Sequence, residues 1–471
     1  MTAQPAASAL GGRSVAGNLA AQGAAVGLVF VAGLLVARLA GAEVLGEYAL
    51  LRVLPWLTGV VVSCGLPLAS AYFLAGERRE DPRLPPTLAL LALAGAVAGA
   101  LLWLALLPLF DAFFTTVPGW QLTLLAATVV TQLFTVWGKA CCQGRADLRG
   151  ANLIIVTEEL LFLPAYGLAL LGGLHGSTAV VTGLLGGGAA ATAVSLGRLA
   201  ATGFGRGWGR PHRPLAAEVV GYGARGQLGN VLMLVNLRLD FLVVGTLSGP
   251  AVLGVYAVAS KFAELMRLPA VALHYVLYPR FARAGADRAR AEMRRFLPRA
   301  TALTAVLAPP LAGAAVLLLP ALYGREFAGA VVPACILLAG LAVEGAAAVS
   351  TAYLFGVGRP GMNSWGMAAG VVVTVGLDVL LIPRYEAVGA AAASGVAYLV
   401  TTAVLVALAR AVAAHGTRPR RNRHAHSIRP PQVRTPSRPG RPRRRRARGA
   451  GGTDGPAPLT AGQPGGRDHA A

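Results

Sequence analysis

The sequence predicts an all-α polytopic membrane protein with about twelve transmembrane helices. Of its 471 residues, 55% are hydrophobic and 13% are charged, whereas an average soluble domain carries roughly 25% charged residues. Apolar runs of the roughly 20 residues that a membrane-spanning helix needs recur along the chain. These runs are too many and too long for a soluble protein.

Clusters of Pro, Gly and Arg separate the apolar runs and mark loops. The first fourteen residues contain one Arg and no pattern for signal-peptide cleavage, so we expect the first helix to remain as an anchor. The expected helices cover residues 15–37, 45–75, 86–109, 119–141, 151–171, 178–202, 216–245, 251–278, 298–320, 329–356, 362–382 and 387–412.

The loops predict the orientation in the membrane, because Lys and Arg accumulate in short cytoplasmic loops. Loops after even-numbered helices contain 18 basic residues, whereas the other loops contain only Arg38, Arg325 and Arg384. Both termini are therefore expected in the cytoplasm. All but two of the 42 basic residues are Arg, alongside abundant Ala and Gly. This bias indicates a GC-rich bacterial genome, and hence a bacterial cytoplasmic (inner) membrane.

A short motif occurs twice. Leu39–Leu50 (LAGAEVLGEYAL) matches Leu247–Val258 (LSGPAVLGVYAV) at 7 of 12 positions, although two Gly-Ala-Leu-rich loops could also match by chance. Each copy joins the first two helices of a six-helix half, and an even number of helices makes the halves parallel. The expected domains are an N-terminus (1–14), an N-terminal lobe (15–203), a cytoplasmic linker (204–215), a C-terminal lobe (216–412) and a basic tail (413–471).

The tail carries much of the chain's charge. It contains 14 Arg against Asp454 and Asp468, so it contributes +12 to a net charge of +22. With almost no aliphatic residues it cannot form a core, and we expect it to be disordered in the cytoplasm. Anionic lipid headgroups are its expected partners, at about 1 kcal/mol per nearby basic residue. Nucleic acid is a less favoured partner, because no aromatic residues are interleaved to stack on bases.

Ionisable residues inside the apolar helices point to a binding site, since each costs at least about 2.5 kcal/mol in a bilayer. Basic residues predominate on the first two helices of each half, which predicts a mostly cationic cavity for an anionic ligand such as a diphosphate. As alternatives, Glu264 could neutralise Lys261, and Asp240 could be a structural partner of Lys261. Arg238 could reach Asp240 or snorkel to the surface, and Arg38 could be an interfacial anchor. The candidate cavity residues are Arg52, Arg238, Asp240, Lys261, Glu264, Arg267 and Arg38.

Isolated carboxylates are candidates for coupling transport to a proton or sodium gradient. Two adjacent glutamates cannot share one helix face, so at most one of Glu158 and Glu159 is expected to face a cavity. We expect no other cofactor, no metal site and no catalytic residue, and four unpaired, packed cysteine thiols. The candidate ion-coupling residues are Asp240, Glu344, Asp378 and Glu158.

Several stretches resemble the polysaccharide-export flippases of the MATE-like (MOP) superfamily. The resemblance implies two six-helix lobes, a central cavity and alternating access, with a polyprenyl diphosphate-linked oligosaccharide as substrate. It also implies polysaccharide polymerases or glycosyltransferases as partners. The matching stretches are ARLAGAEVLGEYAL (37–50), LRLDFLVVGTLSGPAVLGVYAVASKFAEL (237–265), VLYPRFAR (276–283), LYGREFAGAVVPACILLAG (322–340) and IPRYEAVGAAAASGVAYL (382–399).

Other functions are less well supported by the sequence. A multidrug exporter of the same superfamily would favour carboxylates in its cavity, and a lipid II flippase would differ in its glycan. A membrane enzyme of glycan assembly would need large extramembrane loops or a carboxylate cluster. No glycine-rich nucleotide-binding loop is present, so we do not expect direct ATP hydrolysis.

Overall fold

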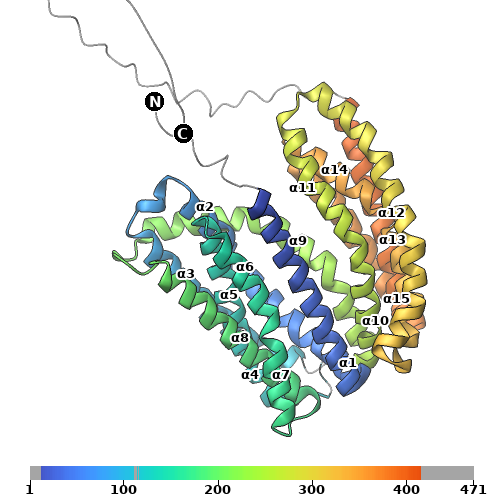
Figure 1. Cartoon of the computed structure of the whole chain (residues 1–471), viewed down its shortest axis with the longest axis horizontal. Coiled ribbons are helices and arrows are strands. Elements are labelled where there is room, and N and C mark those ends of the chain that lie inside the picture. Colours follow the sequence, from blue (N-terminus) through green and yellow to red (C-terminus); the bar gives the residue numbers. More distant parts are fainter. Residues whose placement is uncertain (1–11, 111–113, 115, 415–471) are drawn as a thin grey trace, which may run out of the picture. The chain divides into compact units, whose positions relative to one another are not determined.

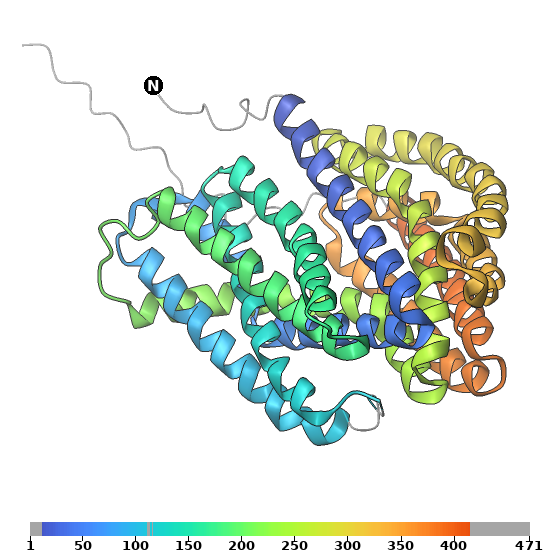
Figure 2. The same ribbon diagram turned by 60° about the horizontal axis from the view of Figure 1, so that its bottom comes forward.

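A computed structural model describes residues 12–110, 114 and 116–414, and its regular elements in this part of the chain are all helices. Most of the predicted N-terminal segment and nearly all of the predicted tail lie outside the described residues. Figures 1 and 2 show the dark blue N-terminal stretch of α1 (Gly12–Val62) between most other helices of the first half and most of those of the second, while α9 (Arg213–Leu247) reaches across to the first half. The predicted all-helical fold is therefore confirmed.

Between residues 12 and 201, the described part of the first half forms eight α-helices and one 3-10 turn. They are α1 (Gly12–Val62), α2 (Leu66–Ala75), η1 (Glu77–Glu80), α3 (Leu84–Phe110), α4 (Gly119–Leu124), α5 (Ala126–Gly144), α6 (Leu148–Leu160), α7 (Phe162–Leu171) and α8 (Gly176–Ala201). Helix α5 is central, because it packs against α2, α3, α6 and α8.

The second half begins at Arg213 and contains seven α-helices. They and two 3-10 turns are α9 (Arg213–Leu247), α10 (Gly249–Ala263), η2 (Glu264–Met266), α11 (Arg267–Arg283), α12 (Ala286–Tyr323), η3 (Arg325–Ala330), α13 (Val331–Leu341), α14 (Glu344–Gly356) and α15 (Pro360–Ala414). Helix α14 packs against α11, α12 and α15, and α13 packs against α10 and α15.

The predicted segments all fall on these helices, but many boundaries differ. Helices α1 and α15 each cover two predicted segments, joined at a kink where Gly41 (φ 82°) and Glu386 (φ 48°) leave the helical conformation. Helix α12 begins at Ala286, ahead of the predicted start at residue 298, so several arginines assigned to a loop lie on a helix.

The number of membrane spans can be compared with the prediction of twelve. Within the described residues, seven helices are long and apolar enough to cross a membrane, or eight if the bent pair Arg325–Leu341 and Glu344–Gly356 forms one span. Two of the seven are the kinked α1 and α15, while α9 to α11 are not among them because they are short or carry polar residues. Large apolar side chains on exposed helix faces, such as Leu101, Leu317 and Val372, suit contact with lipid. The chain is a multi-pass membrane protein, and the number twelve stays a prediction.

The two copies of the repeat pack against each other where the halves meet. A Cβ atom added at Gly46 would lie 1.8 Å from the carbonyl oxygen of Pro250, and one at Gly254 would lie 1.9 Å from that of Ala42. Gly46 and Gly254 are equivalent positions of the repeat, as are Ala42 and Pro250. The contact between α1 and α10 is therefore approximately two-fold symmetric, and it requires glycine at both positions.

A polar contact fixes the end of the first half that is predicted to face the cytoplasm. Asp147 accepts hydrogen bonds from Arg198 Nε and Nη2, both at 2.8 Å, and it also caps α6 by accepting from the Gly150 N–H at 3.0 Å. The hydrogen bonds from Arg198 lower the pKa of Asp147 below its usual value. All four cysteines are free, as predicted, and Cys141 and Cys142 are buried.

Candidate functional site

A cavity of about 380 Å³ lies between the two halves. It is bounded by α1, α5 and α6 from the first half and by α9, α10 and the end of α12 from the second. Aromatic side chains, including Tyr48, Trp56 and Phe241, form much of its apolar wall. Its charged lining residues are Arg52, Lys139, Glu158, Glu159, Arg238 and Lys261.

The first half contributes two ion pairs to this cavity. Arg52 of α1 donates to the Tyr48 hydroxyl at 2.9 Å and forms an ion pair with Glu159 of α6. Lys139 of α5 has its Nζ 3.7 Å from Oε2 of Glu158. The prediction that at most one of the two adjacent glutamates faces a cavity is therefore wrong. Successive side chains are only about 100° apart around a helix, and a cavity this wide is reached by both.

The second half contributes two cations that share one carboxylate. Arg238 Nη1 lies 3.1 Å from Glu264 Oε1, and Lys261 Nζ lies 2.9 Å from Glu264 Oε2. Glu264 is held behind the cavity surface in this shared pair and does not line the cavity. Four basic groups thus stand against three carboxylates, which leaves one positive charge in excess. The cavity is less cationic than predicted, because Glu158 and Glu159 accompany the basic residues.

Two of the arginines predicted for the cavity lie elsewhere. Arg38 donates to the carbonyl oxygens of Ala321, at 2.5 Å, and Leu322. These carbonyls end α12 and have no partner within the helix, so Arg38 joins the two halves by capping them. Arg267 has its Nε 3.8 Å from Glu344 Oε1 and its guanidinium over the ring of Tyr398. Neither arginine lines the cavity.

Asp240 belongs to a second polar cluster inside the second half. Residues two apart on a helix do not share a face, so Arg238 faces the cavity whereas Asp240 is buried, with only 4% of its surface exposed. The Tyr256 hydroxyl donates to Asp240 Oδ2 at 2.5 Å and lies 3.3 Å from Ser394 Oγ. The alternative pairing of Asp240 with Lys261 is therefore not formed. Tyr256 is the repeat equivalent of Tyr48. Each tyrosine hydroxyl forms a hydrogen bond with a charged residue of its own half, Tyr48 with Arg52 and Tyr256 with Asp240.

Asp378 completes this cluster. It is fully buried, and neither of its carboxylate oxygens has a hydrogen-bond partner among the described residues. It lies close enough to Asp240 for the two carboxyl groups to interact electrostatically. A buried carboxyl without a partner is costly, so Asp378, like the buried Asp240, differs from the candidates that are neutralised by a basic residue. The other two, Glu158 and Glu344, are held in ion pairs with Lys139 and Arg267.

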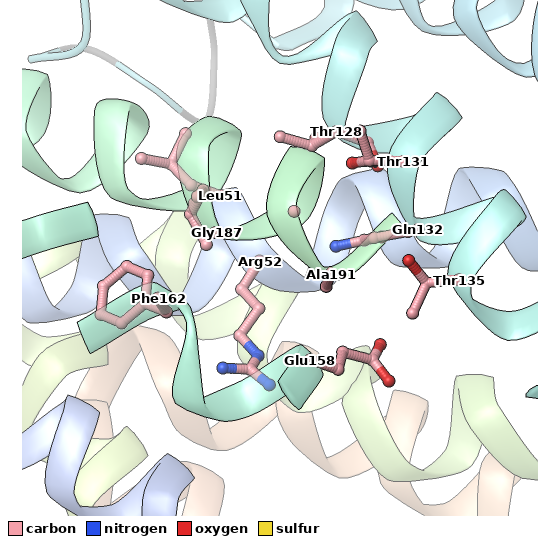
Figure 3. A pocket seen from close by; sticks show the side chains of 12 residues that line it. Leu51, Arg52, Thr128, Thr131, Gln132, Thr135, Glu158, Phe162, Gly187 and Ala191 are labelled. Atoms are coloured by element: carbon pink, nitrogen blue, oxygen red, sulfur yellow. Dashed lines mark hydrogen bonds between the residues drawn. The ribbon is translucent and has the colours of Figure 1, made fainter. Parts of the chain in front are cut away.

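A smaller pocket of about 60 Å³ extends from the cavity into the first half (Figure 3). It shares Arg52, Gln132 and Glu158 with the larger cavity. Figure 3 shows Thr131, Thr135 and Gln132 along α5, across the pocket from Phe162. These neutral polar side chains were not predicted, because threonine and glutamine scarcely alter the hydropathy of an apolar helix.

Comparison with known proteins assigns the chain to a family. A family model described as "Polysaccharide biosynthesis protein" matches residues 35–332, which is more than half of the sequence. The chain belongs to this family. A search of curated proteins finds no significant match.

Solved structures show that this family member has the fold of the MOP superfamily. An inward-facing multidrug resistance MATE transporter matches with a TM-score of 0.65 at 16% identity, over 84% of this chain and 94% of that one. The lipid II flippase MurJ, in an inward closed conformation, matches with a TM-score of 0.63 at 12% identity, over 84% and 87%. A MATE transporter of Vibrio cholerae matches with a TM-score of 0.58 at 13% identity, over 86% and 96%.

Lys139 is the basic cavity residue that the sequence analysis missed, because it was counted with a cytoplasmic loop. Glu159 was also not among the candidates. It lies on α5, facing Glu158. A signal for it does exist in the sequence. This family member uses Arg almost everywhere, and its only two lysines, Lys139 and Lys261, both line the cavity.

Proposed function

We propose that this protein is a flippase that moves a polyprenyl diphosphate-linked oligosaccharide across the bacterial cytoplasmic membrane by alternating access. One observation carries the proposal: basic side chains from both halves converge on a single cavity. Arg52 and Lys139 come from the first half, and Arg238 and Lys261 from the second. A ligand held by both halves links its own binding to their relative movement, as in other transporters built from two repeats.

The ion pairs of the cavity suit a diphosphate that exchanges with carboxylates. Guanidinium groups bind phosphate oxygens through paired, charge-assisted hydrogen bonds. A diphosphate entering the cavity would take over Arg52 from Glu159 and would meet the unbalanced positive charge around Lys261. Because the basic groups keep partners in the empty state, they are not left buried and unpaired, which would be costly.

Reconstitution into proteoliposomes tests this function. Wild-type protein should move a diphosphate-linked oligosaccharide to the opposite leaflet, and Arg52→Ala and Lys261→Ala should each slow this movement at least tenfold at equal expression. Arg288→Ala is the matched control, because Arg288 is exposed on α12 and does not line the cavity. No movement by the wild type would overturn the proposal.

We further propose that a proton or sodium gradient drives transport through Asp240 and Asp378. The support is the burial of both carboxyl groups and their electrostatic interaction, with Asp378 lacking a hydrogen-bond partner among the described residues. Asp378→Asn should abolish the dependence of the transport rate on the imposed gradient. Separate proton and sodium gradients identify the ion. A rate in Asp378→Asn that still responds to the same gradient would contradict this role.

A multidrug exporter is the second candidate function, and the carboxylates Glu158 and Glu159 in the cavity favour it. Efflux of a cationic dye from the same proteoliposomes, abolished by Glu158→Gln, would support that function instead. The third candidate is a lipid II flippase. It is tested by adding lipid II as a competitor for the transport of the diphosphate-linked oligosaccharide. The proposal has three further parts. Both termini lie in the cytoplasm, the tail binds anionic lipids, and a polymerase or glycosyltransferase docks on the protein.

A further inference from the structure

A mostly apolar pocket adjoins the cationic cavity. It has a volume of about 130 Å³ and lies where α1 gives way to α2, against α5 and α9. Trp56 and Gln132 line both the pocket and the cavity, so the two share a wall. The pocket's other lining residues are largely aliphatic and include Val60, Pro67, Leu68 and Val136.

A break in the helix accompanies this pocket. Cys64 (φ 44°) and Gly65 (φ 73°) interrupt the helical path between α1 and α2. Gly65 packs so closely on α9 that an added Cβ atom would lie 2.3 Å from the carbonyl oxygen of Gly223. The Gln227 side chain of α9 also donates to the Val60 carbonyl at 2.5 Å. These contacts hold the interrupted backbone in place beside the pocket.

We propose that this pocket binds the first isoprene units of the substrate's polyprenyl chain while the cationic cavity binds the diphosphate. This inference rests on the proposed function and assigns the lipid part of the same ligand. A diphosphate joined directly to a hydrocarbon chain requires a charged site and an apolar site side by side. The wall formed by Trp56 and Gln132 is where these two environments meet.

The rest of the chain has a route to the bilayer. The pocket is large enough for only a short part of a polyprenyl chain. Leu68, which lines the pocket, is 52% exposed, and Val61, next to the lining residue Val60, is also 52% exposed. Because exposed apolar side chains of a membrane protein face lipid, the chain would leave the pocket over Leu68 and remain in the membrane. The glycan would occupy the aqueous side of the cavity.

Binding measurements on the full chain in nanodiscs separate the two subsites. The probes are inorganic diphosphate and geranyl diphosphate, with empty nanodiscs as the reference for partitioning into lipid. In the wild type, the geranyl chain should tighten binding at least tenfold, because its apolar surface leaves water. Val136→Trp, which fills the pocket, should remove this gain and leave the affinity for inorganic diphosphate unchanged within about twofold.

Two variants make the comparison specific. Val97→Trp is the matched control, because Val97 is exposed on the lipid-facing side of α3, and it should keep the full gain. Val136→Ala, which leaves the pocket open, should also keep it. The lipid subsite would be overturned if Val136→Trp retained the tenfold gain. If wild type bound no inorganic diphosphate, or if Arg52→Gln left its binding unchanged, the failure would lie with the proposed function.

A second measurement does not depend on how the variants fold. A geranyl diphosphate analogue with a photoreactive group at the end of its chain should label wild-type protein within residues 56–68 or 132–136. An excess of unlabelled geranyl diphosphate should prevent the labelling. Labelling confined to other helices, such as α3 or α12, would overturn the proposed lipid subsite.

Discussion

At the scale of single residues, the charge of the cavity depends on which side chains are paired. Sequence alone identified Arg52, Arg238 and Lys261, because a charge in an apolar helix is conspicuous. It offered the pair of Lys261 and Glu264, which forms. It could not assign the other partners: Arg238 also pairs with Glu264, and Arg38 caps carbonyls of α12. Pairing depends on which residues of distant helices face each other, and the rotation of a helix in a bundle is set by packing.

The pairing of Arg52 with Glu159 yields a first prediction. Glu159→Gln removes the carboxylate that a diphosphate must displace and adds one positive charge to the excess, so the affinity for inorganic diphosphate should rise several-fold. Titration calorimetry measures this directly. Glu43→Gln, an exposed position at the far end of the same stretch of α1, serves as the control. An unchanged or weaker affinity in Glu159→Gln would contradict the exchange of carboxylate for phosphate.

Asp147 yields a second prediction at this scale. Asp147→Ala removes the cap of α6, which costs roughly 1 kcal/mol of stability, and also the contact with Arg198. Asn is an equally good cap, so Asp147→Asn removes only the contribution of the charge. Because the pKa of Asp147 is lowered in the folded state, that contribution is present above the ordinary carboxyl pKa of about 4 and is lost as the pH falls through the lowered value.

Thermal unfolding in detergent across pH tests this sign. The melting temperature of Asp147→Asn should lie below that of the wild type at pH 7, and the two should converge at acid pH. A difference that widens on acidification would show that Asp147 does not act through its charge.

At the scale of elements, the repeat predicted where the two halves correspond, but not that its two copies touch. The predicted helices were found, whereas the breaks at residues 63–65, at Leu161 and at 264–266 were not. Apolar residues continue across the break at Leu161, so no local signal marks it. The other two breaks contain Gly65 and Glu264, but each interrupts an otherwise apolar stretch too briefly to end a predicted segment. The charged residues Glu158, Glu159 and Glu264 lie at such breaks or within three residues of them, which is why their directions could not be predicted from helical periodicity.

The contact between Gly46 and Gly254 yields the third prediction. Gly46→Val or Gly254→Val places a side chain where a backbone carbonyl lies within 2 Å, so α1 and α10 should separate. Spin labels at the exposed, equivalent positions Leu39 and Leu247, in a chain without its native cysteines, report the distance between the outer ends. The distance should increase in both variants. Gly27→Val has open space around it and should leave the distance unchanged, and an unchanged distance in all three variants would contradict the contact.

At the scale of the whole molecule, the two halves share one cavity. The alternation of basic loops and the internal repeat predicted two six-helix halves. The all-helical fold is confirmed and is shared with solved structures of the MOP superfamily, whereas six spans in each half stays a prediction. The size of the cavity and its apolar neighbour could not be predicted, because both result from contacts between helices that are far apart in sequence. If a diphosphate is bound by both halves at once, the basic residues of the two halves must act together.

The most direct test compares transport by Arg52→Gln, Lys261→Gln and the double variant in proteoliposomes with a diphosphate-linked oligosaccharide. Two residues that hold the same group are coupled, so their effects should not add. We predict that each single variant slows outward movement at least tenfold and that the double variant is scarcely slower than either. Single variants that keep the wild-type rate would contradict the account, and so would independent effects that multiply in the double variant.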